Sequence, residues 1–410
     1  MKPRICVLTA GHLATTPRMV KAADALAEEG YDVSVVSTRF MDWADKADRS
    51  ILASRWSRWR WTTVDYRRHG AFGRYLLTGI RMKTIRQIAR VRRMKRISLG
   101  IAGRVRERAL PELVSAAVST RPRLIYGGGG ALAATAIAAQ QIGVPFALDL
   151  EDFHSAEDPP GAFFGVTEKI ERRILARAAL LTAGSRAIAE AYRSAYDLDV
   201  LAIDNVFRLP EQSPVPREWD GILRLYWFGQ TVGPERGLEE TIRAAGAAGI
   251  RSEFAIRGRA SEEYLDFLRT LSAEVAPSLD LSALAPGSPD QMVDLCRPYD
   301  VGMAIENPER HSQELALTNK SLTYILAGLA VAMTDTIGQH ELGTDLGDGS
   351  LLCARGDTDA LARGLKRWST EPQTLATAKE AAWKAARRRW HWDHAEERGK
   401  LLEAIAGVLR

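Results

Sequence analysis

The sequence predicts an α/β protein of two Rossmann-like domains, each built on a parallel sheet. The chain has 410 residues, more than one hydrophobic core normally organises. Apolar strand-like runs alternate with amphipathic helical runs in both halves, and such β-α-β units form parallel sheets through right-handed crossovers. A proline-rich stretch, residues 210–216, separates the halves and reads as a linker.

The first β-α-β unit opens the chain. Residues 4–10 (RICVLTA) form a buried apolar run that predicts a strand, and residues 32–37 (DVSVVS) predict the next one. Between them, Thr16-Pro17 provides an N-cap and a first helical residue. Gly11, in the loop before this helix, lets the backbone approach a diphosphate, although an ordinary tight turn explains the same glycine.

Residues 41–110 show no clear sheet pattern, and from residue 75 onward they follow helical spacing. Within this stretch, residues 55–108 (the basic segment) carry seventeen Lys and Arg side chains, opposed only by Asp65 and Glu107. Tryptophans interleave with arginines at its start. Three interpretations remain open: a solvated helix face, docking on an anionic membrane surface, or nucleic-acid binding. No nucleic-acid recognition module is visible, so we expect no nucleic acid as a partner.

Residues 124–149 repeat the β-α-β pattern, with a glycine-rich turn after the first strand. Gly128-x-Gly130-x-x-Ala133 fits the dinucleotide fingerprint, and Asp149 follows at a suitable distance. Glycines also gather where a helix packs closely on a strand, so the match is weak. An NAD(P)-dependent oxidoreductase therefore remains only a remote alternative.

Ionisable side chains crowd the end of the strand that reaches Asp149. Open α/β sheets bind their ligands at the carboxyl ends of such strands. The alternatives are capping carboxylates paired with an arginine, or a carboxylate metal site. The cluster contains Asp149, Glu151, Asp152, His154 and Glu157.

The second half begins with a strand at residues 223–228, followed by a glycine-containing loop and a helix that runs to about residue 248. Residues 301–305 predict a further strand, and a polar loop follows. Asn319-Lys320 then open a short helix that stops near Gly328. Free backbone N–H groups and a cation meet at this helix start, which is how α/β domains build phosphate sites.

This last region resembles the donor-binding segment of retaining glycosyltransferases of family 4, which often read P-N-K-x-x-E-Y-x-x-x-G. The matching residues here run from Thr318-Asn319-Lys320 to Tyr324 and Gly328. The stretches TPRMVKAADALAEEGYDVSVV and IERRILARAALLTAGSRAIAEAY also look like family segments, whereas residues 41–110 do not. The resemblance implies the GT-B fold, with an interdomain cleft and a C-terminal helix that crosses back. We expect domains at 1–210 and 211–385, with that helix at 386–410.

The resemblance also implies donor-binding residues. Arg236 takes the place of the family's lysine and, with Lys320, is expected to contact the diphosphate. Gln230 replaces the family's arginine, and Thr323 replaces the carboxylate that grips the ribose. Glu314 serves as the first donor-site glutamate only after a one-residue slip. The full donor-side set is Gly11, Gly229, Gln230, Arg236, Gly237, Arg257, Gly258, Glu314, Asn319, Lys320 and Thr323.

On the acceptor side, the family often reads D-A-H-E. Glu151 falls on the histidine position and Asp152 on the glutamate position, so these two are the candidate catalytic residues. A carboxylate there can stabilise an oxocarbenium-like state or receive a proton. Asp149 and His154 are expected on the acceptor side of the same site.

The sequence and the resemblance together predict a glycosyltransferase that moves a sugar from a nucleotide-diphosphate donor to a glycan, polysaccharide or lipid-linked acceptor. The family resemblance alone implies transfer with retention and without a metal cofactor. The alternative is a degenerate GT-B protein that binds a nucleotide or partner without transfer. No apolar run approaches the roughly 20 residues that span a bilayer, and the N-terminal run is too short for a secretory signal. Three widely spaced cysteines read as reduced thiols. We expect a cytoplasmic protein, with peripheral binding to the inner face of the plasma membrane left open.

Overall fold

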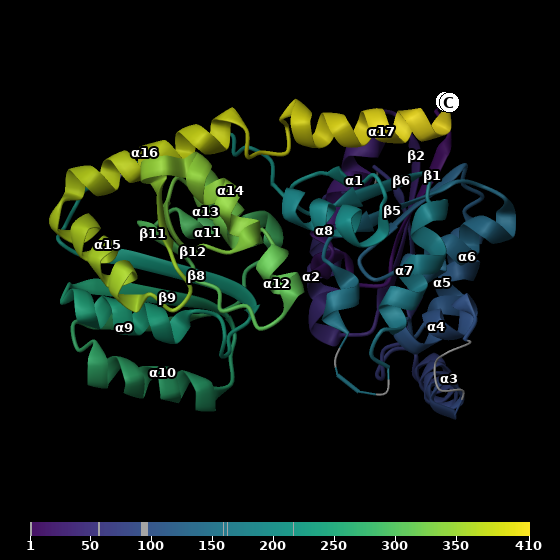
Figure 1. The fold of residues 1–410 in the computed structure, drawn as a ribbon, viewed down its shortest axis with the longest axis horizontal. Helices are drawn as coiled ribbons and strands as arrows, with labels where there is room; N and C mark the ends of the chain where they lie inside the picture. The colour runs from purple at the N-terminus through teal and green to yellow at the C-terminus, as the bar shows by residue number, and fades with distance from the viewer. Residues whose placement is uncertain (1, 56–57, 92–96, 159, 162, 216) are drawn as a thin grey trace. The chain divides into compact units, whose positions relative to one another are not determined.

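The computed structural model describes residues 2–55, 58–91, 97–158, 160–161, 163–215 and 217–410. The chain forms two compact units, one of Met1–Asp204 with Arg398–Arg410 and one of Asn205–Glu397. Each unit holds one sheet covered by helices, labelled in Figure 1. All strand pairings between described residues are parallel, which confirms the predicted fold class. Among the described residues, no helix combines the length and the apolar character that a bilayer crossing requires.

The sheet of the first unit has seven strands in the order β3-β2-β1-β4-β5-β6-β7. Its centre is apolar because both faces are covered, and β1 residues 5–8 are fully buried. The strands are β1 Arg4–Thr9, β2 Asp32–Arg39, β3 Arg60–Asp65, β4 Leu124–Gly128, β5 Phe146–Leu150, β6 Leu180–Ala183 and β7 Leu201–Ala202.

Helices follow the strands of this unit. A serine before the helical run predicts an N-cap at Ser185, and its hydroxyl accepts a hydrogen bond from the Ile188 N–H. The C-terminal helix belongs to the same unit and contacts its first helix. The helices are η1 Leu13–Thr15, α1 Pro17–Glu28, α2 Asp42–Ala53, α3 Phe72–Val91, α4 Leu99–Arg106, α5 Leu110–Ser119, α6 Leu132–Ile142, η2 His154–Glu157, α7 Val166–Ile174, η3 Leu175–Arg177, α8 Arg186–Tyr196 and α17 Lys400–Leu409.

The prediction that residues 41–110 lack sheet character is wrong. Residues 60–65 form β3, which pairs with β2 at the edge of the sheet. Most of its side chains are exposed or half-buried, so it lacks the apolar run of an inner strand. The helical stretch also divides into α3 and α4. Trp56, Arg92, Arg93, Lys95 and Arg96, all part of the predicted basic segment, lie outside the described residues.

The sheet of the second unit has six strands in the order β10-β9-β8-β11-β12-β13. The strands are β8 Leu223–Thr231, β9 Ser252–Arg259, β10 Leu279–Leu284, β11 Val301–Ala304, β12 Ala330–Thr334 and β13 Ser350–Cys353. The helices are α9 Leu238–Ala248, α10 Glu262–Val275, η4 Pro289–Gln291, α11 Met292–Cys296, α12 His311–Leu315, α13 Asn319–Leu326, α14 Ile337–Leu346, η5 Gly347–Gly349, α15 Thr358–Thr370 and α16 Pro372–Arg388; a π-helical turn, η6 Ala395–Gly399, follows.

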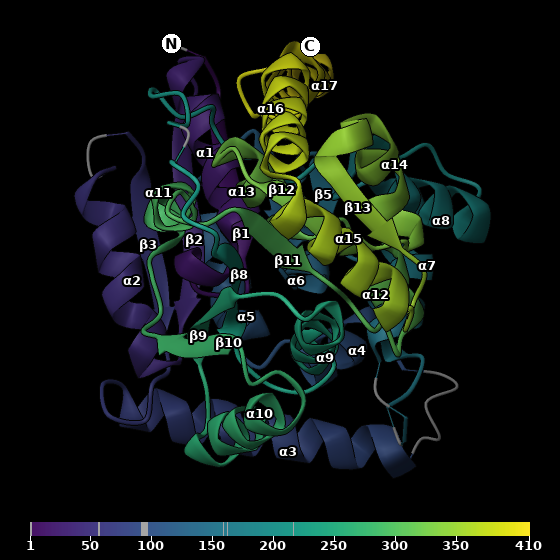
Figure 2. The same ribbon diagram turned by 90° about the vertical axis from the view of Figure 1, so that its left-hand side faces the viewer.

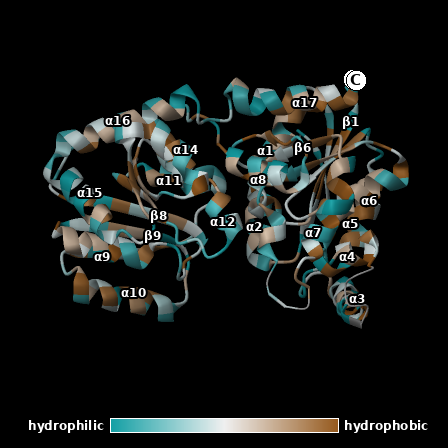
Figure 3. Ribbon diagram, viewed as in Figure 1, coloured by the Kyte–Doolittle hydropathy of each residue, from teal (hydrophilic) through white to brown (hydrophobic). Residues whose placement is uncertain are grey.

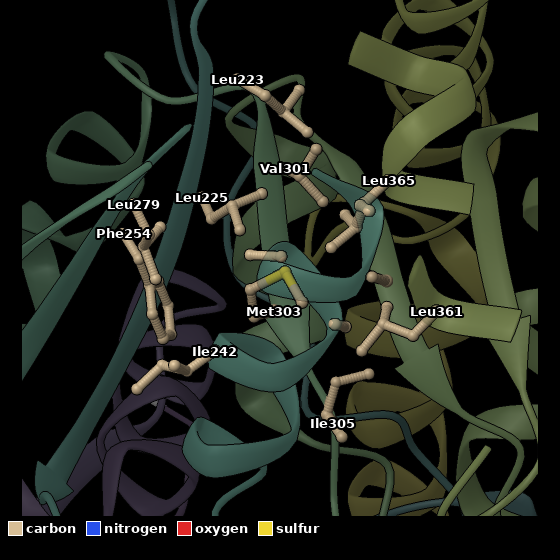
Figure 4. Close-up of a cluster of buried hydrophobic side chains, with 14 of the residues drawn as sticks. Leu223, Leu225, Ile242, Phe254, Leu279, Val301, Met303, Ile305, Leu361 and Leu365 are labelled. Carbon is tan, nitrogen blue, oxygen red and sulfur yellow. The ribbon is translucent and has the colours of Figure 1, made fainter. Parts of the chain in front are cut away.

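The core of the second unit lies between one face of its sheet and helices α9 and α15. Figure 4 shows Leu225, Phe254 and Met303 on the sheet side, with Ile242 and Leu361 from the two helices. Figure 3 shows the same division by hydropathy, with apolar residues along the strands and polar residues on the outer turns of the helices. This packing fixes where the strands end, and therefore where polar side chains emerge.

Two local predictions in this unit need correction. The loop expected to be irregular from residue 306 to residue 317 contains the short helix α12, which carries Glu314. The sequence Ser288-Pro289-Asp290-Gln291 predicts a capping box, which is absent: the Ser288 hydroxyl donates to the Gln291 side chain at 3.0 Å, and the helix begins as the 3-10 turn η4 before α11. The expected linker begins after the observed unit boundary at Asp204, and Pro216 lies outside the described residues.

Candidate functional site

Asp149 lies one residue before the end of strand β5, and its carboxylate is held from inside the first unit. Arg18 of α1 donates from Nε to Asp149 Oδ2 at 2.7 Å, and both side chains are buried. The hydroxyls of Thr182 and Tyr126 donate to Oδ1 at 2.5 and 3.2 Å. The remaining Arg18 donors reach two main-chain carbonyls. Asp149 has an exposed fraction of 0%, so it supports the strand end from inside the unit. This differs from the expectation that Asp149 contacts the acceptor.

Glu151 and Asp152 continue the chain out of that strand and are half-buried. Burial raises the pKa of Glu151 to about 7, and the negative charges of Asp152 and Asp149 act in the same direction. Burial also raises the pKa of Asp152. A carboxyl group that titrates near neutral pH can both accept and release a proton there. The two predicted catalytic residues are therefore adjacent, and the pKa of Glu151 suits proton transfer near neutral pH, while their catalytic role stays a prediction.

His154 opens the η2 turn and forms an ion pair within it. Its Nδ1 lies 3.1 Å from Glu157 Oε2. Burial lowers the pKa of His154, but the hydrogen bond and charge of Glu157 outweigh burial and raise it to about 9. The imidazole is therefore a cation at neutral pH.

The side chains of Asp152, His154 and Glu157 could together hold a metal ion, since one ligand atom of each lies within 4.8 Å of the others. Only neutral imidazole binds metals. His154 would have to lose its proton and its bond to Glu157 first. The arrangement fits an internal ion pair better than a preformed metal site, and no metal is assigned to it.

The glycine-rich turn before α6 does not offer a dinucleotide site. Two main-chain N–H groups in the first turn of this helix, at Ala133 and Ala134, donate to the two carboxylate oxygens of Glu107 at 2.8 and 3.0 Å. Burial raises the pKa of Glu107 to about 8, although these two bonds lower it. An added Cβ at Gly127 would lie 1.8 Å from Thr135 Oγ1, so this glycine serves close helix packing. A side chain of the protein fills the place where the fingerprint would hold a pyrophosphate.

The loop that contains Gly11 is also held from within. The Gly11 N–H donates to Thr9 Oγ1 at 3.1 Å. His12 is buried, with Nδ1 at 2.7 Å from Asp48 Oδ2, and its Nε2 accepts from the main-chain N–H groups of Phe40 and Met41 at 2.9 and 3.0 Å. These bonds require a neutral imidazole with its proton on Nδ1. This geometry is that of a tight turn, and the contact of Gly11 with a diphosphate stays a prediction.

In the second unit, Lys320 lies in the first turn of α13, as the sequence predicts. Its Nζ is 2.6 Å from Glu306 Oε1, and the two side chains are 13% and 15% exposed. The same Nζ lies 5.7 Å from the ring centroid of Trp227 on β8. The neighbouring Asn319 accepts a hydrogen bond from the Asn205 amide at 2.8 Å. Glu306 is thus the carboxylate that faces the lysine, a partner that the sequence analysis did not select.

The other two expected donor contacts in this region lie differently. Thr323 is 2% exposed, and its hydroxyl donates to the Asn319 carbonyl at 2.8 Å. Its hydroxyl is therefore bonded within α13 and is not exposed to a ribose. Glu314, on α12, has Oε1 at 3.4 Å from the Ile337 N–H at the start of α14.

Gln339 holds this region together and was missed by the sequence analysis. It is fully buried, and its amide donates to the carbonyls of Ala304 and Thr334 at 3.2 and 3.0 Å. Its Oε1 accepts from Ser321 at 2.8 Å. These bonds join the ends of β11 and β12 to the start of α13. A glutamine inside a helical pattern gives no sequence signal for such a role.

The turn between β8 and α9 presents a second cation. Gly237 has a positive φ of 71°, and an added Cβ would lie 2.3 Å from the Ile305 carbonyl, so the start of α9 rests directly on the end of β11. Arg236, the preceding residue, is exposed. In the described part of the chain, no carboxylate lies within 4.0 Å of Arg236. Gln230, at the end of β8, is also exposed.

The three remaining expected donor positions, Gly229, Arg257 and Gly258, lie near the ends of β8 and β9. An added Cβ at Gly258 would lie 2.6 Å from the Gly229 carbonyl, so the two strands approach closely there. Arg257 is already engaged, because its Nε donates to the Tyr226 hydroxyl at 2.6 Å and its Nη1 to the Ala285 carbonyl at 2.7 Å. Gly258, beside that arginine, is half-buried.

The structure thus brings part of the predicted donor set together. The starts of α9 and α13 both adjoin the end of β11, one through Gly237 and Ile305 and the other through the Lys320–Glu306 pair. Each helix start carries a cation, Arg236 or Lys320. Free N–H groups and cations at neighbouring helix N-termini suit a ligand with several phosphate charges.

Comparison with known proteins gives no match to a protein-family model and no match to a curated protein. Solved structures do match over nearly the whole chain. HepE from Anabaena, solved with UDP and glucose, has 18% identity and a TM-score of 0.67, with 99% of each chain covered. Sucrose-phosphate synthase from Thermosynechococcus elongatus has 11% identity and a TM-score of 0.68, covering 99% of this chain and 100% of that chain. TarM from S. aureus, solved in one complex with UDP, has 9% identity and a TM-score of 0.65, with 100% of each chain covered. The chain therefore has the GT-B fold of these proteins.

Proposed function

We propose that the protein is a glycosyltransferase that takes its sugar from a nucleotide-diphosphate donor bound to the second unit. One observation carries the proposal: Arg236 and Lys320 lie at two helix starts that adjoin the end of β11. A leaving diphosphate gains negative charge in the transition state, and cations already in place stabilise that charge. HepE and TarM, which share the fold, were solved with UDP.

The two cations have different roles in this proposal. Arg236 is exposed and without a carboxylate partner in the described chain, so its guanidinium is available for bidentate phosphate binding. Lys320 is held by Glu306, which fixes the direction of the ammonium group before a donor arrives. The N–H groups of the α13 start add donors that require no reorganisation. We assign Gly229, Gln230, Arg257, Gly258 and Asn319 to the surroundings of the same donor.

We further propose UDP as the nucleotide and Glu151 with Asp152 as the catalytic carboxylates. HepE was solved with UDP-glucose, which supports a uridine donor. The pKa of Glu151, raised to about 7, suits proton transfer from an acceptor hydroxyl near neutral pH. Retention, membership of family 4 and transfer without a metal rest on the sequence resemblance.

We propose a glycan, polysaccharide or lipid-linked molecule as acceptor, and a cytoplasmic protein that works at the inner face of the plasma membrane. His154, which Glu157 keeps protonated by raising its pKa, would face the acceptor.

The test is titration of the protein with UDP, GDP, ADP and NAD by calorimetry, with Arg236→Ala beside wild type. Arg243→Ala is the matched control, because Arg243 is an exposed arginine on α9, the helix that follows Arg236. We expect one nucleoside diphosphate to bind, at least tenfold weaker binding in Arg236→Ala, and no change in the control. No binding by any nucleotide, or equal affinity in wild type and both variants, contradicts the donor site. Binding of NAD alone would favour the oxidoreductase alternative.

A further inference from the structure

Helix α3 presents apolar side chains to solvent along one stripe. It is the longest helix of the first unit and is seen lengthwise in Figure 2. Phe72, Leu76, Leu77 and Ile80 are 57%, 44%, 58% and 64% exposed. Their spacings of three and four residues place them on neighbouring positions of one helix face. Such clustered exposure differs from the isolated apolar residues of an ordinary protein surface.

The opposite face of α3 is firmly anchored, so the exposed stripe is not a frayed end. Thr78 is fully buried, and Arg108 donates to its hydroxyl at 3.0 Å and to the Tyr75 carbonyl at 2.6 Å. Arg81 pairs with Glu112 of α5 at 2.6 Å. The fold itself therefore directs the stripe outward.

The charges around the stripe are positive, and apart from Arg81 none of them has a carboxylate partner among the described residues. Residues 72–91 contain five Lys and Arg and no Asp or Glu. Arg74, Lys83 and Arg90 are exposed, and within the described chain no carboxylate lies within 4.0 Å of them. Lys83 is three residues after Ile80 and lies beside it on the helix surface.

The earlier part of the basic segment behaves differently, because carboxylates of the same unit neutralise it. Arg55 pairs with Asp24 at 2.8 Å, and Arg67 pairs with Asp65 at 2.7 Å. Arg60 pairs with Asp32. The positive charge that the sequence spreads over residues 55–108 is thus concentrated, in the described structure, on and around α3.

We infer that the outward face of α3 docks on an anionic lipid bilayer, with Leu77 and Ile80 entering the interface and Lys83 and Arg90 meeting lipid phosphates. Amphipathic helices with an apolar stripe and flanking cations bind membranes in this way. Self-association through two such faces would bring like charges together, and a nucleic-acid backbone would leave the apolar stripe without a partner. The inference deepens the membrane location in the proposed function and does not depend on donor chemistry.

The experiment is co-sedimentation of the full chain with vesicles of phosphatidylcholine, with and without phosphatidylglycerol. Leu77→Glu/Ile80→Glu should lower partitioning to the anionic vesicles at least tenfold. Lys83→Gln/Arg90→Gln should lower it about fivefold for each charge and weaken its salt dependence, since each surface cation contributes about 1 kcal/mol. Phe267→Glu, at a 48% exposed apolar residue on α10, is the control and should bind like wild type.

Circular dichroism and UDP titration of each variant separate this inference from the donor site. Lost vesicle binding with intact folding and UDP affinity supports α3 docking even where transfer fails. Equal sedimentation of wild type and Leu77→Glu/Ile80→Glu overturns it. So does a wild-type oligomer on gel filtration that this variant dissociates, because the stripe would then be covered by a second copy.

Discussion

The Lys320–Glu306 pair gives the sharpest quantitative prediction. The charges are 2.6 Å apart and only 13% and 15% exposed. At an effective dielectric constant of about 20, their attraction is roughly 6 kcal/mol, and desolvation of both groups offsets much of it. In Lys320→Met the Glu306 carboxylate stays largely buried but loses its cation. Apart from the lysine, Glu306 Oε1 has no partner among the described residues. Loss of one member of such a pair costs about 3 kcal/mol of unfolding free energy.

A double-mutant cycle separates the structural role of this pair from its role in binding. Lys320→Met, Glu306→Gln and the combined variant are unfolded in urea, and each is titrated with UDP. The combined variant should recover to within about 1 kcal/mol of wild-type stability, because no charge is left unpaired. UDP affinity should fall at least tenfold wherever the lysine is absent and should persist in Glu306→Gln.

Two results would refute this reasoning. If the combined variant were as unstable as Lys320→Met, the unpaired carboxylate would not be the cause of the lost stability. If it regained wild-type UDP affinity, Lys320 would hold the fold and would not contact phosphate.

Three further predictions concern the first unit. Glu107→Ala should lower the unfolding free energy by about 2 kcal/mol in urea, because the buried N–H groups at the start of α6 lose their acceptors; unchanged stability would contradict the capping role. The pKa of His154 is raised from 6.5 to about 9, so its pairing with Glu157 stabilises the fold fully below pH 6.5 and is lost as the pH rises through 9. His154→Gln should therefore flatten the fall of stability across that range, and an unaltered pH profile would show that the pair is not formed. Glu151→Gln should reduce the transfer rate by about 10²-fold or more and remove a rate step near pH 7; an unchanged profile would exclude Glu151 as the proton carrier.

Local patterns predicted most of the fold because they act over a few residues. The inner strands are continuous apolar runs, and Ser185 caps α8 as expected. The start of α13 at Asn319 and its end before Gly328, whose φ is 75°, also follow from local signals. Strand β3 was missed because it pairs on one edge only and because the alternating arginine and tryptophan residues of the sequence that leads into it, up to Trp61, resemble a solvated surface.

The site was predicted less well because its contacts join distant residues. The sequence placed the carboxylates around Asp149 at a strand end but could not show that Arg18, 131 residues earlier, neutralises Asp149. Residue spacing in the family motif favoured Glu314 as the donor-site glutamate. In the structure, the loop after β11 instead places Glu306 beside Lys320. The arginines of the basic segment looked unopposed because their partners lie upstream, in α1 and β2.

The most direct test of the proposed function is sugar transfer itself. Purified protein is incubated with labelled UDP-sugars and a membrane lipid extract, and both released UDP and labelled product are measured, with the Lys320→Met/Glu306→Gln variant beside wild type. We predict release and product from one UDP-sugar with wild type, and at least a tenfold loss in the variant, which should remain folded. Tight UDP binding by wild type without release or product from any sugar would contradict transfer and leave a nucleotide-binding protein of the same fold.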